Sequence, residues 1–69
     1  MATAHPTALA EMIAVVGIAT AHSRAMGRPD PTDDELTRLL LASDFAAADI
    51  ARDLATVQVA VAETMGESA

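Results

Sequence analysis

A run of helix-breaking residues near the middle of the chain divides it into two arms. Gly27 is followed by Arg28-Pro29-Asp30-Pro31. Proline has no amide hydrogen to donate inside a helix, and it disfavours the helical conformation in the residue before it. Positions 27–32 are therefore predicted to form a loop. On both sides of the loop the apolar residues recur with the period of a helix, so the fold is predicted to be all-α.

The boundaries of the helices are marked by residues that start and end helices. Pro6 suits the first turn of a helix, and Gly27 can adopt the left-handed conformation that ends one. Thr32 and Glu35 have the spacing of a capping box. The predicted layout is one domain, residues 1–69, with a helix over about 7–26, a loop over 27–32 and helices over 33–42 and 45–65, while residues 1–5 and 67–69 fray.

A break inside the C-terminal arm decides between two versions of this fold. Ser43 and Asp44 offer a second N-cap ahead of an alanine-rich run, and Gly66 can end the helix that follows. With the break, the chain is a small three-helix bundle. Without it, the chain is a helical hairpin with one long second arm.

The chain has few large apolar side chains with which to build a core. Of its 69 residues 17 are alanine, Phe45 is the single aromatic residue, and there is no cysteine to form a disulfide. A core of this size stabilises a domain by only roughly 3–5 kcal/mol, and small proteins often gain stability by association. We therefore expect the bundle to oligomerise or to dock on a partner.

The last helix is predicted to have one buried apolar stripe and one solvent-exposed face. The stripe is Ile50, Leu54, Val57, Val61 and Met65, and the opposite side carries Asp49, Arg52, Asp53, Thr56 and Glu63. Between them runs an alanine flank, which consists of Ala48, Ala51, Ala55 and Ala62. This pattern is typical of a helix at the surface of a small domain.

The first helix is apolar almost all round. A bulky side is formed by Leu9, Met12, Ile13 and Val16, and a small-residue side by Ala10, Ala14, Gly17, Ala21 and Ala25. Such a helix is usually buried on more than one side, and a chain this short has few elements to cover it. Two interpretations remain open: the small-residue side packs on the alanine flank of the last helix, or it meets a second copy or a partner helix.

The favoured function is therefore a non-catalytic protein-protein interaction module. It would be a small acidic accessory subunit, assembly factor or regulator that forms a homodimer or docks on a larger protein. The candidate partner-binding residues are Leu9, Met12, Ile13, Ala14, Val16, Gly17, Ala21 and Arg24. Arg24 is included because it flanks the loop and could anchor an acidic group of the partner.

The sequence contains no pattern typical of a catalytic, metal or cofactor site. His5 is expected in the N-terminal tail and His22 at a half-exposed structural position, and the two do not have the spacing of metal ligands. No glycine-rich phosphate loop is present, and Ser23 and Ser43 have no histidine base close in sequence. We expect no enzyme activity, no metal and no cofactor.

The net charge of −6 supports an alternative function. It argues against nucleic acid and anionic membranes as partners, but an acidic chain could block a basic protein surface, as inhibitors of the phage anti-defence type do by mimicking nucleic acid. The acidic surface in that case is Asp30, Asp33, Asp34, Asp44, Asp49 and Asp53.

No apolar run is long enough to span a bilayer, and residues 1–11 have no positive charge for a secretory signal, so a cytoplasmic location is expected.

A further alternative is a degenerate DNA-binding regulator. Residues 36–61, LTRLLLASDFAAADIARDLATVQVAV, resemble the helix-turn-helix of response-regulator DNA-binding domains. That resemblance implies that the last helix would enter a DNA groove. However, Asp44 occupies the turn where those domains usually have glycine, and residues 55–63, where basic or amide residues line their recognition helix, offer only Gln58 and Thr56.

Overall fold

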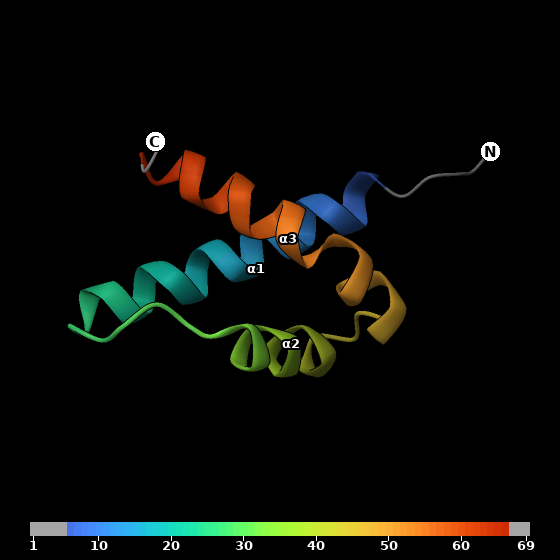
Figure 1. The fold of residues 1–69 in the computed structure, drawn as a ribbon, viewed down its shortest axis with the longest axis horizontal. Helices are drawn as coiled ribbons and strands as arrows, with labels where there is room; N and C mark the ends of the chain where they lie inside the picture. Colours follow the sequence, from blue (N-terminus) through green and yellow to red (C-terminus); the bar gives the residue numbers. More distant parts are fainter. Residues whose placement is uncertain (1–5, 67–69) are drawn as a thin grey trace.

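Residues 6–66 fold into a small bundle of three α-helices (Figure 1). The computed structural model describes residues 6–66, in which α1 spans Pro6–Ala25, α2 spans Asp33–Ala42 and α3 spans Ala47–Thr64. The all-α prediction is confirmed, in its three-helix form. His5 and the expected fraying of 1–5 and 67–69 lie outside the described residues.

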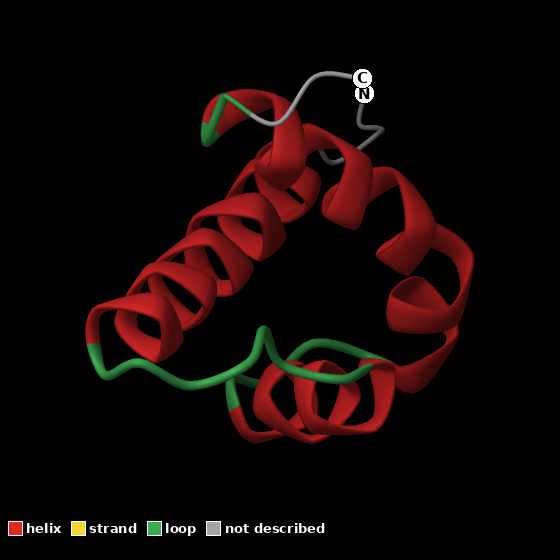
Figure 2. Ribbon diagram, turned by 60° about the vertical axis from the view of Figure 1, so that its left-hand side comes forward, coloured by secondary structure: helices red, strands yellow, loops and turns green. Residues whose placement is uncertain are grey.

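The ends of α1 and the start of α2 have the structures that their sequences predict. Gly27 has a φ of +73°, and the amide of Arg28 donates to the carbonyl of Ser23 (2.8 Å), which closes α1 with a Schellman motif. At the start of α2 the capping box is complete: the amide of Thr32 donates to Glu35 Oε1 (2.8 Å), and the amide of Glu35 donates to Thr32 Oγ1 (3.2 Å). Figure 2 shows the long connection between these two helices.

The break between α2 and α3 is present, but its structure differs from the predicted N-cap. Ser43 is the C-cap of α2, and Asp44 has a φ of +73°. The amide of Phe45 donates to the carbonyl of Leu40 (3.1 Å), so this turn is also a Schellman motif, with aspartate where glycine is usual. The prediction that Ser43 or Asp44 caps the third helix was wrong. That helix starts later, and its N-cap is Ala46.

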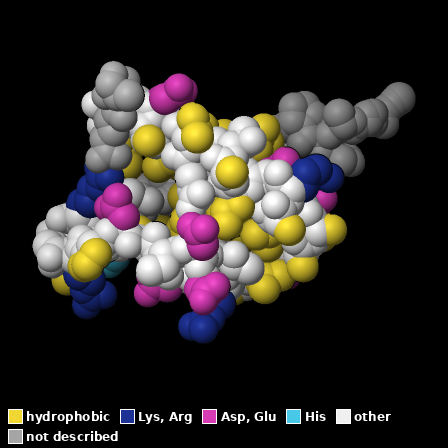
Figure 3. All heavy atoms as spheres, in the orientation of Figure 1, with side chains coloured by type: hydrophobic (Ala, Val, Ile, Leu, Met, Phe, Trp, Pro, Cys, Tyr) yellow, Lys and Arg dark blue, Asp and Glu magenta, His cyan; other side chains and the backbone are white. Residues whose placement is uncertain are grey.

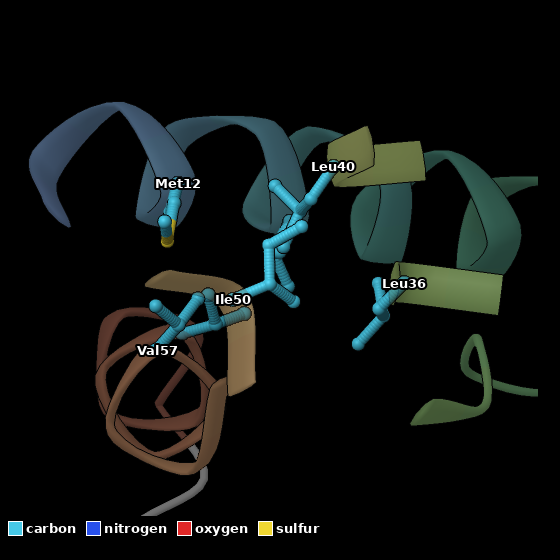
Figure 4. Close-up of a cluster of buried hydrophobic side chains, with 7 residues drawn as sticks. Met12, Leu36, Leu40, Ile50 and Val57 are labelled. Atoms are coloured by element: carbon cyan, nitrogen blue, oxygen red, sulfur yellow. The ribbon is translucent and has the colours of Figure 1, made fainter. Parts of the chain in front are cut away.

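All three helices contribute to one core. Figure 4 shows Met12 of α1, Leu40 of α2 and Val57 of α3 converging on the same space. The buried apolar residues are Met12, Val16, Leu36, Leu40, Ile50, Val57 and Val61, and the partly buried ones packed against them are Leu9, Ile13, Val15, Phe45, Leu54 and Met65. The predicted stripe of α3 therefore forms the α3 side of the core.

The two predicted sides of α1 have different surroundings. Met12 and Val16 on the bulky side are buried, whereas Ala14 and Ala21 on the small-residue side are exposed. Of the alanine flank of α3, Ala48, Ala51 and Ala55 are exposed, and Ala62 is half-buried. The interpretation that these two small-residue surfaces pack on each other is therefore wrong. Larger side chains remove more apolar area from water, and they form the contact between α1 and α3.

Candidate interaction surface

The predicted partner-binding residues separate into core residues and surface residues. Met12 and Val16 are almost completely buried in the chain's own core, so in this fold they cannot contact a partner. Their inclusion among the contact residues was an error. Leu9 and Ile13 are half-buried against the same core.

The exposed side of α1 has Ile18 at its centre. Ile18 is 70% exposed, the largest exposed fraction among the large apolar residues that the structure describes. The sequence analysis did not select it, because the sequence alone does not show which side of α1 is buried. On a helical wheel Ile18 lies opposite the direction shared by Met12 and Val16, so once these two are buried Ile18 must point to solvent.

An apolar groove runs along one side of Ile18, between α1 and the C-terminal half of α3. It has a volume of about 410 Å³. Its lining, which defines the α1–α3 groove, is Ile13, Ala14, Gly17, Ile18, Ala21, Val61, Thr64 and Met65. A methyl group added at Gly17 would meet nothing within 4 Å, so the floor of the groove is open at that point.

A second depression lies on the other side of Ile18, between α1 and α2. Its volume is about 360 Å³, and its lining, which defines the α1–α2 hollow, is Val15, Ile18, Ala19, His22 and Leu39. Ile18 belongs to the walls of both depressions. The outer face of α1 is therefore a projecting isoleucine between two shallow hollows, neither of which contains an acidic residue or an arginine.

Arg24, in the last turn of α1, binds a carboxylate of its own chain. Its Nε and Nη2 donate to the two carboxylate oxygens of Asp30, at 2.8 Å each. These charge-assisted bonds hold the pKa of Asp30 below its ordinary value. The acidic group that we expected a partner to supply is thus supplied by the loop after α1. Both residues also line a smaller pocket of about 220 Å³, beside Thr20 and Gln58.

The residues of the predicted acidic surface are dispersed, and several have partners. Arg52 forms ion pairs with Asp49 and Asp53 at 3.1 Å, and the hydrogen bonds to Asp53 raise the pKa of Arg52. Gln58 donates to Asp33 (2.6 Å). Figure 3 shows acidic side chains scattered over the face in view, some directly beside arginines. Asp34 is exposed at the start of α2, and Asp44 lies in the turn after it.

The part of the chain that the structure describes has neither a candidate metal site nor a candidate membrane span. The described part of the chain contains no group of three or more His, Cys, Asp or Glu side chains placed to hold a metal ion. Within residues 6–66, none of the helices combines the length and hydrophobicity needed to cross a bilayer. Comparison of the chain with protein-family models, with curated proteins and with solved structures gives no match.

Proposed function

We propose that this protein is a non-catalytic interaction module, which binds another protein chain through the outer face of α1. Such a chain would serve as a small accessory subunit, assembly factor or regulator. The observation that carries the proposal is Ile18, 70% exposed between two apolar hollows on one helix. Contiguous apolar surface of this kind on a soluble domain commonly marks a protein contact.

The energetics of a small domain support this proposal. A core formed by seven buried apolar residues leaves little stability in reserve. Burying one more isoleucine is worth about 1.5–3 kcal/mol, a large fraction of the total for a chain of this size. Association through Ile18 would therefore both create the complex and stabilise the fold.

The acidic-inhibitor alternative has less support. Asp30, Asp49 and Asp53 form ion pairs with arginines of the same chain, which reduces the negative potential available to a basic partner. For the helix-turn-helix alternative, Gln58 was one of two side chains that could face DNA. Its hydrogen bond to Asp33 directs it toward α2 instead.

Photo-crosslinking in the native host tests the proposed surface. A photoreactive amino acid at Ala21, on the wall of the α1–α3 groove, is expected to give a crosslinked adduct with a protein. The matched control places the same residue at Thr56, which is exposed on α3. We expect no adduct at the control position, because Thr56 lines neither the α1–α3 groove nor the α1–α2 hollow.

The crosslinking result has two outcomes that count against the proposal. If Ala21 gives no adduct under conditions in which the probe is photolysed, the outer face of α1 contacts no protein. If Ala21 and Thr56 give the same adducts with equal yield, the contact is not specific to this face. In either case, the protein binds its partner through a different surface, or it is not an interaction module.

A further inference from the structure

The loop after α1 contains an aspartyl-prolyl peptide bond, between Asp30 and Pro31. We propose that the chain cleaves itself slowly at this bond in weak acid, without an enzyme, and that Arg24 restrains the cleavage. The products are residues 1–30, which contain α1, and residues 31–69, which contain α2 and α3. This inference goes beyond the proposed function, because it concerns a reaction of the chain with itself and water.

The reaction needs only the groups of Asp30 and Pro31 and one molecule of water. A side-chain carboxylate oxygen of Asp30 attacks the main-chain carbonyl carbon of the same residue, and a five-membered cyclic anhydride forms. The bond from that carbon to the nitrogen of Pro31 breaks as the nitrogen takes a proton from solvent. The nitrogen leaves as a secondary amine, which is more basic than the primary amine that other residues release, and it takes up a second proton.

Hydrolysis of the anhydride completes the balance. Water opens the ring and leaves Asp30 with two carboxylates, its side chain and the new chain end. The two protons released in this step equal the two that the nitrogen of Pro31 took up. No oxidant, reductant or metal takes part.

The structure leaves the bond open to water and to cleavage. Asp30 lies outside the helices, and its side chain is 51% exposed. The nitrogen of Pro31 carries no hydrogen, so it makes no backbone hydrogen bond that cleavage would break. The cut falls after the Schellman motif that ends α1 and before the capping box that starts α2. Neither helix end therefore has to unfold before the bond breaks.

Arg24 holds both oxygens that could act as the nucleophile. Its Nε donates to Oδ1 of Asp30 and its Nη2 donates to Oδ2, at 2.8 Å each. An oxygen that attacks the carbonyl carbon loses its negative charge, and with it most of its attraction to the guanidinium. The ion pair is thus stronger in the ground state than in the transition state, which slows the reaction.

The restraint does not depend on a change in ionisation at the pH of the test. The hydrogen bonds from Arg24 lower the pKa of Asp30 from its ordinary value of 3.8, so at about pH 5 the side chain is a carboxylate with or without Arg24. Arg24 and Asp30 line one pocket with residues of α1, α2 and α3, and none of the other residues in that lining ionises. A difference in rate at pH 5 therefore reports the ion pair.

Mass spectrometry of the intact chain measures the cleavage. The parent protein, incubated at about pH 5 over weeks, should accumulate the fragments 1–30 and 31–69. Arg24→Gln should form them about 2–5-fold faster, which is the range that an exposed ion pair supports. Arg24→Lys keeps the charge but cannot bind both oxygens in the same way, so its rate should fall between the two.

Two control variants accompany this measurement. Arg38→Gln removes an equal charge from an exposed position on α2 and should be cleaved at the parent rate. Asp30→Ala has no carboxylate to attack the carbonyl carbon, so it should give neither fragment.

Urea separates the effect of the ion pair from other effects of the substitution. In urea that unfolds the chain the ion pair is absent, and the parent and Arg24→Gln should be cleaved at the same rate. Circular dichroism at the same pH without urea checks that Arg24→Gln is folded. Faster cleavage of a folded variant then comes from the loss of the ion pair.

Three results would overturn the proposal. If neither the parent nor Arg24→Gln yields the two fragments, the chain does not cleave itself at this bond. If Asp30→Ala yields them at the parent rate, the carboxylate is not the nucleophile. If folded Arg24→Gln and the parent are cleaved equally fast, Arg24 does not restrain the reaction.

Discussion

At the scale of single residues, the ion pair of Arg24 and Asp30 connects the end of α1 to the loop that follows. The guanidinium depresses the pKa of Asp30 from its ordinary value of 3.8 when the chain is folded. A carboxyl whose folded pKa is depressed stabilises the fold at pH above its unfolded pKa. That contribution is therefore complete above about pH 5 and is lost as the pH falls through 3.8 toward the lower, folded value.

The pKa of Asp30 gives a direct check of this contact. In Arg24→Gln we expect it to rise toward 3.8, because the neutral amide no longer favours the carboxylate. The measurement is a ¹³C NMR titration of the side-chain carboxyl. Arg38→Gln, which removes an equal charge from exposed α2, is the control and should leave the titration unchanged. An Asp30 curve that does not move in Arg24→Gln would contradict the proposed cause.

At the scale of elements, the three helices differ in how their ends are satisfied. A Schellman motif ends α1 and another ends α2, and a complete capping box starts α2. The N-cap of α3 is Ala46, which has the extended conformation of an N-cap but no side chain able to accept a hydrogen bond. The start of α3 is therefore the least stabilised of these helix ends.

This difference leads to a stabilising substitution. Ala46→Ser supplies an oxygen in a backbone that already has a φ of −70° and a ψ of 141°, so we expect the free energy of unfolding to rise by about 1 kcal/mol. Urea denaturation, followed by circular dichroism, measures this change in the free energy of unfolding. Ala48→Ser, inside the first turn of α3, is the control and should bring no gain. Equal effects of the two substitutions would mean that capping is not the cause.

At the scale of the whole molecule, stability depends on a single core. Leu40 is 0% exposed, whereas its neighbour Leu41 is 46% exposed. Truncating a buried leucine costs about 2–5 kcal/mol, which is comparable with the roughly 3–5 kcal/mol that a core of this size provides. Leu40 therefore contributes much more to the stability of the fold than Leu41 does.

Alanine at each of these two positions tests the single core. We expect Leu40→Ala to be largely unfolded at 25 °C and Leu41→Ala to lose less than about 1 kcal/mol. Thermal unfolding monitored by circular dichroism at a fixed protein concentration compares them. A Leu40→Ala variant that unfolds at the same temperature as Leu41→Ala would show that Leu40 does not contribute to a common core.

Local signals in the sequence were sufficient to predict where α1 ends and where α2 begins. Gly27 and the prolines after it interrupt a helix through backbone geometry alone, and the capping box joins residues only three apart. The stripe of α3 was also predictable, because its charged residues leave a single side to bury. The turn at Asp44 was not predicted, since aspartate can either cap a helix or adopt the left-handed conformation.

The sequence by itself therefore determined the helices, the loop after α1 and the buried side of α3. Only the tertiary structure decided which side of α1 faces inward. Because α1 is apolar almost all round, its periodicity does not distinguish the two sides, and the choice depends on which side chains bury the most area against α2 and α3. Packing of Met12 and Val16 inside the bundle leaves Ile18 in solvent, so the candidate interaction surface is a consequence of how the core is formed.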